Sequence, residues 1–154
     1  MVFIEARPAL VQLPTYYADD YRLTHNPVPG ETQTAKERGG FQYQFAKRSC
    51  DEFSSEVPEG ASVLDVGCSA GGFLARLQEV KKYDLYGCDL NPEDVAYVRD
   101  VGQLPCEVGA VATVFPGRTF TAISALHVLE HIPDPVAWLR AVRERLIGGG
   151  WLYL

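Results

Sequence analysis

From residue 61 onward, the chain alternates between short apolar runs typical of buried strands and segments with helical periodicity. We expect strands over residues 61–67, 84–90, 105–110 and 120–126, helices over residues 72–80, 91–100 and 134–147, and a turn into a fifth strand over residues 148–154. This alternation predicts βαβ units, which build a parallel sheet with helices on both faces. Right-handed crossovers then give a doubly wound α/β fold, with a ligand crevice at the carboxyl ends of the strands.

The first 56 residues follow a different pattern. Prolines and a tyrosine cluster make residues 1–35 irregular. Residues 31–55 predict a helix, because three phenylalanines recur near helical spacing, although a Gly-Gly pair weakens its start. We therefore divide the chain into an N-terminal arm and helix, residues 1–56, and an α/β core, residues 57–154.

Composition narrows the partners of this 154-residue chain. Its net charge is −6, whereas nucleic-acid binders usually carry a basic face, so we expect no nucleic-acid partner. No apolar run approaches the roughly 18 residues that span a bilayer, so we expect no membrane association. Four cysteines show neither a CxxC pair nor zinc spacing, which predicts reduced thiols in a cytoplasmic protein: Cys50, Cys68, Cys88 and Cys106.

The segment "VLDVGCSAGGFL", residues 63–74, carries the strongest signal for a ligand. Its glycines follow an expected strand and open an expected helix, so a ligand can approach the backbone and the helix N–H groups closely. It lacks the Gly-Lys-Ser/Thr of a phosphate P-loop and the Gly-x-Gly-x-x-Gly order of a dinucleotide site. Asp65, before the first glycine, would repel a pyrophosphate but could attract an ammonium group or accept hydrogen bonds from the loop.

A second acid, Asp89, ends the next expected strand. A carboxylate at that position can accept both hydroxyls of a ribose, as in nucleotide-binding sheets generally. The alternative is that Asp89 only caps the helix that begins at Asn91-Pro92. Both readings remain open at this point.

Four segments in register resemble the class I S-adenosylmethionine-dependent methyltransferases: "VLDVGCSAGGFL", "YGCDLNPE", "FTAISALHVLEHIPDP" and "RERLIGGGWLYL". The resemblance covers residues 61–154. Its "HVLEHIPDP" segment is similar to the branch that methylates small molecules, including sugars, quinone precursors and natural products. The resemblance implies a Rossmann-like, mostly parallel sheet of strand order 3-2-1-4-5, with S-adenosylmethionine as cofactor and S-adenosylhomocysteine as product.

The resemblance also implies roles for particular residues. The glycine loop would hold the methionine part of the cofactor, with Asp65 anchoring the loop and helping to hold the amino group. Asp89 would hold the ribose hydroxyls, and apolar residues after the second and third strands would line the adenine. The implied cofactor-binding residues are Asp65, Gly67, Cys68, Ser69, Gly71, Asp89, Leu90, Ala110, Val111 and Leu126.

The chain departs from the family pattern in single residues and in length. One departure is Phe120-Thr121, where a Phe-Asp pair often opens the fourth strand. Ser69 stands where the family usually has glycine, and Ala110 where an Asp often reads the adenine amino group, so we expect that contact to be missing. Family members also normally continue through two more strands, whereas this chain stops at Leu154. We therefore expect a core truncated after strand five, whose open edge the N-terminal arm or a second copy in a homodimer would cover.

Methyl transfer needs an aligned acceptor and, where the acceptor carries a proton, a base. His127, expected at the end of the fourth strand, is the first candidate base, since histidine titrates near neutral pH. The alternative is that it only lines the pocket. His131 is a further catalytic candidate, but we expect it and Glu130 to pin the short turn that follows the strand. His127 and His131 lack an evident third ligand, so no metal is expected. The resemblance implies that Tyr21 or Tyr43 caps the cofactor; the alternative is that they only pack an amphipathic arm.

Three functions remain. The first is a methyltransferase that acts on a small-molecule acceptor. The second is a truncated or accessory cofactor-binding domain without turnover, which associates through its open sheet edge. A nicotinamide-dependent oxidoreductase is disfavoured by Asp65 and by the absence of a catalytic Tyr-x-x-x-Lys pair.

Overall fold

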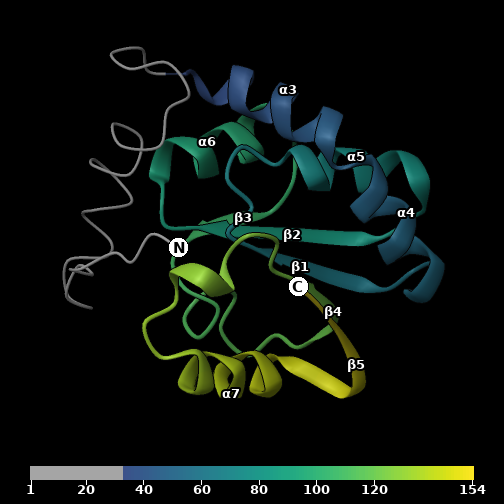
Figure 1. The fold of residues 1–154 in the computed structure, drawn as a ribbon, viewed down its shortest axis with the longest axis vertical. Coiled ribbons are helices and arrows are strands. Elements are labelled where there is room, and N and C mark those ends of the chain that lie inside the picture. Colours follow the sequence, from purple (N-terminus) through teal and green to yellow (C-terminus); the bar gives the residue numbers. More distant parts are fainter. Residues whose placement is uncertain (1–32) are drawn as a thin grey trace, which may run out of the picture.

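The computed structural model describes residues 33–154. Five strands form one sheet in the order β3-β2-β1-β4-β5, and every neighbouring pair is parallel (Figure 1). The strands are β1 (Ser62–Val66), β2 (Asp84–Asp89), β3 (Cys106–Val108), β4 (Phe120–Ser124) and β5 (Leu146–Tyr153). This order confirms the fold class that the strand and helix alternation predicted.

Helices cover both faces of the sheet, as a doubly wound fold requires. Figure 1 shows α3, α4, α5 and α6 on one side and α7 on the other. Their bounds are α3 (Ala35–Phe45), α4 (Lys47–Glu56), α5 (Gly72–Val80), α6 (Pro92–Asp100) and α7 (Pro135–Arg145), and a short 3-10 helix, η3 (Leu129–His131), follows β4.

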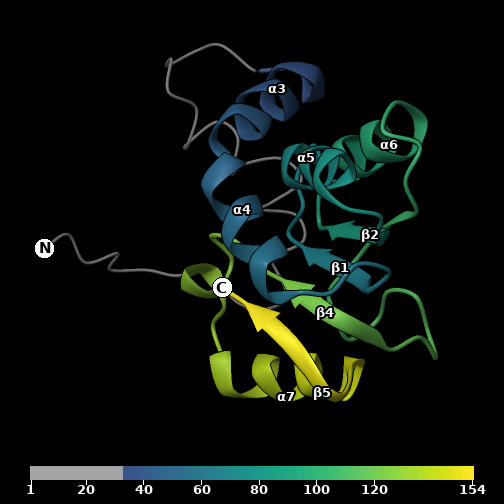
Figure 2. The ribbon, with the colours of Figure 1, turned by 90° about the vertical axis from the view of Figure 1, so that its right-hand side faces the viewer.

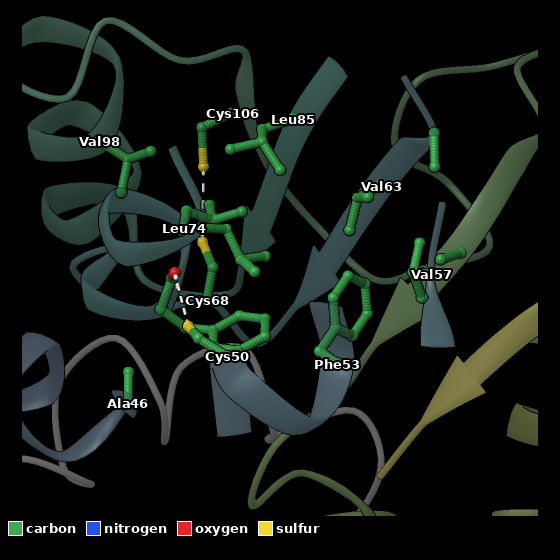
Figure 3. Close-up of a cluster of buried hydrophobic side chains, with 14 of the residues drawn as sticks. Ala46, Cys50, Phe53, Val57, Val63, Cys68, Leu74, Leu85, Val98 and Cys106 are labelled. Atoms are coloured by element: carbon green, nitrogen blue, oxygen red, sulfur yellow. Dashed lines mark hydrogen bonds between the residues drawn. The ribbon is translucent and has the colours of Figure 1, made fainter. Parts of the chain in front are cut away.

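Each face of the sheet carries its own apolar core. The core under α4, α5 and α6 centres on the fully buried Phe53, Leu74 and Leu77. Figure 3 shows this cluster, in which the Sγ atoms of Cys68 and Cys106 lie 3.7 Å apart. The core under α7 is built mainly from β1, β2 and β4, with Phe120, Ile123 and Val142 fully buried. All four cysteines are buried free thiols.

The helix expected over residues 31–55 is in fact two helices, so that prediction was wrong in its extent. Thr34 caps the first of them: its Oγ1 accepts from the Glu37 N–H at 3.3 Å, and the Glu37 carboxylate accepts from the Thr34 N–H. Helix α3 ends at Phe45 and α4 begins at Lys47, with Ala46 between them (Figure 2). The break lets α4 bury Phe53 in the core while α3 lies across α5 and α6.

The last helix and strand meet earlier than the sequence predicted. Helix α7 ends at Arg145 and β5 begins at Leu146, so the three glycines 148–150 belong to the strand rather than to a turn before it. Leu146 pairs with Phe120, but the next partner, Ala122, pairs with Trp151. The extra residues form a bulge, and glycines at such a bulge tolerate backbone conformations that other residues disfavour.

Helix α3 rests directly on the start of α5. A Cβ atom on Gly72 would lie 2.5 Å from the backbone N of Tyr43 and 2.7 Å from the carbonyl O of Gly39. A Cβ atom on Gly39 would in turn lie 3.0 Å from the carbonyl O of Ala70, in the glycine loop. Gly39 therefore does more than weaken the helix, because its missing side chain lets α3 contact the loop.

Replacing Gly72 with Ala should therefore lift α3 off the loop. We expect Gly72→Ala to lower the free energy of unfolding by about 1–3 kcal/mol, the usual cost of overpacking, measured by urea denaturation. Gly40→Ala is the matched control, because a Cβ atom there meets nothing within 4 Å and alanine favours a helix interior. It should raise stability slightly. Equal stability of Gly72→Ala and the wild type would contradict the proposed packing of α3 against Gly72.

Candidate functional site

A cavity of about 640 Å³ opens at the carboxyl ends of the parallel strands, within the size range of small-molecule sites. The loops after β1, β2, β3 and β4 form its floor, and α3 supplies a wall. The cavity brings together most of the site residues expected from the sequence: Asp65, Gly67, Cys68, Ser69, Asp89, Leu90, Ala110, Val111, Leu126, His127 and His131.

Gly71 is the one expected cofactor residue outside the lining of this cavity. It precedes α5 with a φ of 76°, in the left-handed region that favours glycine. A Cβ atom there would lie 2.8 Å from Cγ2 of Val98 on α6. Gly71 therefore packs the loop against α6.

Asp65 is a buried carboxylate at the end of β1 that faces the cavity. Its Oδ1 accepts a hydrogen bond of 2.8 Å from the Ser124 hydroxyl on β4. Burial raises the pKa of Asp65 to about 7; the hydrogen bond from Ser124 lowers it, and nearby Asp89 raises it further. A cation in the cavity would favour the charged form of this group.

Asp89 ties the glycine loop to the end of β2. Its two oxygens accept from the backbone N–H groups of Ser69 and Asn91, each at 2.8 Å. Burial raises the pKa of Asp89, while these backbone hydrogen bonds lower it. A carboxylate offers about four acceptor positions, so Asp89 keeps acceptor capacity for a ligand. Asn91 itself caps α6, accepting from the N–H groups of Glu93 and Asp94, so Asp89 is not the helix cap of the alternative reading.

Hydrogen bonds hold Ser69, the residue at the usual glycine position, in the loop. Its φ of 46° lies in the left-handed region, which explains why the family favours glycine there. Its hydroxyl donates to Asp94 on α6 at 3.1 Å, and Asp94 also accepts from the Nε of Arg38 at 3.1 Å. This partly buried network joins the loop, α6 and α3. It could not be predicted from the sequence, because its members are far apart along the chain.

The other end of the cavity is more apolar. Val111 is buried in the core under α7, Leu90 is half-buried and Ala110 is exposed. The backbone N–H of Gly109 donates to the Asp89 carbonyl at 2.9 Å, which holds the loop after β3 against β2. These surfaces suit a flat apolar group.

His127 follows β4 with a φ of 56°, an uncommon conformation for a residue other than glycine. Its side chain is 92% exposed, and its Nδ1 lies 3.6 Å from Oε1 of Glu130. Glu130 therefore points towards His127. His131, at the end of η3, lines the same cavity.

Several residues of the cavity were not identified from the sequence: Arg38, Phe41, Gln42, Phe45, Asp94 and Trp138. Four of them lie on α3, and only the packing of α3 on the loop reveals them. Tyr43, a predicted cap, lies outside the cavity lining; its hydroxyl donates to Glu79 at 2.6 Å. Tyr21, the other predicted cap, lies outside the described residues.

Residues 39–154 match a family model described as a methyltransferase domain. The chain belongs to this family. The predicted resemblance to class I methyltransferases is therefore confirmed, and the sheet order agrees with it.

Curated relatives include the ubiquinone biosynthesis O-methyltransferases of Xanthomonas campestris and Xylella fastidiosa. The first is 37% identical over 103 residues, which cover 62% of this chain and 42% of the relative. The second is 34% identical over 112 residues, which cover 68% of this chain and 45% of the relative. The chain thus spans less than half the length of these relatives.

Solved structures show the same fold. An amino pentose methyltransferase from Micromonospora echinaspora, bound to S-adenosylmethionine, is 27% identical, with a TM-score of 0.59 over 77% of this chain and 52% of that one. Magnesium protoporphyrin IX methyltransferase from Synechocystis PCC 6803 is 18% identical, with a TM-score of 0.66 over 94% of this chain and 74% of that one. At its low identity, the second likeness concerns the fold alone.

In residues 33–154, no group of three or more His, Cys, Asp or Glu side chains is arranged to hold a metal ion. None of the helices in the same residues is long and apolar enough to cross a membrane.

The raised pKa of Asp65 should make stability depend on pH. Unfolded, Asp65 loses its proton near pH 3.8; folded, it keeps the proton until about pH 7. Its contribution to stability therefore falls as pH rises between these values and stays constant above them. The asparagine of Asp65→Asn would not titrate, so the free energy of unfolding of this variant should not fall in this way. Relative to the wild type, it should rise by on the order of 2 kcal/mol from pH 5 to pH 8, measured by urea denaturation.

Asp100→Asn is the control for this effect, because Asp100 is exposed at the end of α6. Its stability curve should run parallel to that of the wild type. A parallel curve for Asp65→Asn as well would show that Asp65 does not hold a proton in the folded state.

Proposed function

We propose that this chain binds S-adenosylmethionine and transfers its methyl group to a small-molecule acceptor. The observation that carries the proposal is the pair of carboxylates, Asp65 and Asp89, at the ends of neighbouring strands around a glycine loop. The curated relatives, which methylate in ubiquinone biosynthesis, support a quinone-like acceptor, with sugars and natural-product intermediates as further classes.

The cavity suits the charge of this cofactor. Three carboxylates line it, Asp65, Asp89 and Asp94, while Arg38 is the one Lys or Arg among its described lining residues. S-adenosylmethionine carries a sulfonium and an ammonium against one carboxylate, so a net negative cavity attracts it. We assign its methionine part to the loop from Gly67 to Ser69.

The remaining cofactor groups fit the rest of the cavity. The acceptor capacity that remains on the Asp89 carboxylate can take the ribose hydroxyls. Leu90, Ala110 and Val111 present an apolar surface for the adenine, and we assign Leu126, which also lines the cavity, to the side of the transferred methyl group.

When bound, S-adenosylmethionine supplies an activated methyl group, so the protein must position the acceptor and remove its proton. We propose His127 as the base that takes this proton. Its left-handed backbone holds it at the cavity after β4. Glu130, with Oε1 3.6 Å from Nδ1, would stabilise the charged imidazole that proton transfer produces. His131 is a secondary candidate on the same turn.

The acceptor side of the cavity favours an apolar or aromatic molecule. Val128, Ile132 and Trp138 line it from one side, and α3 contributes Phe41 and Phe45. The two phenylalanine rings lie 4.5 Å apart and are 60% and 69% exposed. Exposed aromatic side chains beside a cavity can stack on a planar ring, which supports a quinone-like acceptor over a sugar.

The second candidate function is a cofactor-binding domain without turnover. The exposed Ile147 and Trp151 on the edge strand β5 favour association through this edge, either with another protein or in a homodimer. The N-terminal arm is the other surface proposed for a dimer. The four buried thiols support the proposed cytoplasmic location.

Calorimetric titration with S-adenosylmethionine and with NAD tests the cofactor. Binding of the first without the second is expected, and no binding of S-adenosylmethionine would overturn the proposal. A transfer assay with catechol and amino-sugar acceptors then separates the candidate functions. Cofactor binding without transfer to any acceptor would favour the non-catalytic domain.

Replacing His127 with Ala should slow methyl transfer by roughly 100-fold or more, the usual contribution of a positioned base. Affinity for S-adenosylhomocysteine should stay unchanged, because the proposed role concerns the acceptor. Glu130→Gln should cause a smaller loss, since it removes only the partner of the imidazole. Wild-type turnover of His127→Ala would exclude this residue as the base.

A further inference from the structure

One side-chain atom in the cavity wall lacks a partner. The Oε1 atom of Gln42 is buried and accepts no hydrogen bond from the residues that the structure describes. Gln42 also lines the cavity. A buried acceptor without a donor destabilises the protein, so a ligand that brings a donor to this atom gains affinity from it.

The position of Gln42 indicates which part of a ligand it would meet. If Gly72, the residue that directly follows the glycine loop, carried a Cβ atom, that atom would lie 2.4 Å from the Cβ of Gln42. The Gln42 side chain therefore starts beside the loop to which we assign the methionine part of the cofactor. Asp65 lines the same cavity from the end of β1. Two acceptors, one of them acidic, suit a cation with several N–H donors, and an ammonium group offers three.

We propose that the side-chain carbonyl of Gln42 accepts a hydrogen bond from the ammonium group of S-adenosylmethionine, so that α3 recognises the amino-acid end of the cofactor. This inference rests on the proposed function for the identity of the cofactor. It extends that proposal by making the N-terminal helix a part of the cofactor site, alongside the glycine loop.

The neighbours of Gln42 hold it in place for this role. The backbone of α3 contacts Gly72 so closely that no side chain fits between them. Arg38, one helical turn before Gln42 and on the same face, bonds to Asp94, which also accepts from Ser69 in the loop. The acceptor is thus positioned relative to the loop before a ligand binds, which reduces the entropic cost of binding.

Calorimetric titration of the full chain with S-adenosylhomocysteine and with methylthioadenosine, which lacks the amino-acid end, tests the inference. Gln42→Leu should lower the affinity for S-adenosylhomocysteine at least about tenfold, because the variant loses a hydrogen bond to a charged group. Affinity for methylthioadenosine should not change. Gln44→Leu is the matched control, since Gln44 lies exposed on the same helix outside the cavity lining, and it should leave both affinities unchanged.

Gln42→Glu tests whether the carbonyl oxygen or the N–H₂ group of the Gln42 amide contacts the ligand. A carboxylate keeps the acceptor and adds charge, so S-adenosylhomocysteine should bind as tightly as to the wild type or more tightly. Weaker binding would show that the amide N–H₂ reads the ligand carboxylate, and would overturn the inference. Equal losses of both ligands in Gln42→Leu would also overturn it, because they would indicate a distorted helix. If the wild type binds no S-adenosylhomocysteine, the proposed function fails instead.

Discussion

The site depends on one close contact, between the backbone of α3 and the first residue of α5. Gly72 has no side chain, and atoms of Gln42, Tyr43 and Gly39 occupy the space where a Cβ would stand. Because of this contact, a helix outside the α/β sheet forms a wall of the cavity at the strand ends. The glycine loop thus has two functions: it leaves room for a ligand on one side, and it seats α3 on the other.

The electrostatics of the cavity follow from where the strands end. Asp65 and Asp89 lie at the ends of neighbouring parallel strands, so the charge of Asp89 adds to the cost of ionising the buried Asp65. The protein meets this cost with hydrogen bonds from Ser124 and from the loop backbone. Such a site is acidic and already ordered, and a cationic ligand relieves its remaining repulsion.

Much of this arrangement could be predicted from the sequence, because it depends on local patterns. Apolar runs followed by Asp65 and Asp89 predict strands, and the parallel topology then brings the two acids to one edge. The break at Ala46, the bulge in β5 and the pairing of Arg38 with Asp94 could not be predicted. Each depends on how distant segments pack, for which the sequence carries no periodic signal. Gln42 belongs to this group, since only the docked helix shows that its carbonyl lacks a partner.

The most direct test of the claim that α3 and the glycine loop form one site is hydrogen–deuterium exchange of the chain with and without S-adenosylhomocysteine. Ligand binding slows exchange where it suppresses local opening. We predict slower exchange both in the loop, residues 67–71, and in the cavity-facing part of α3, residues 38–45. Protection of the loop alone, with α3 exchanging as in the free protein, would contradict the account.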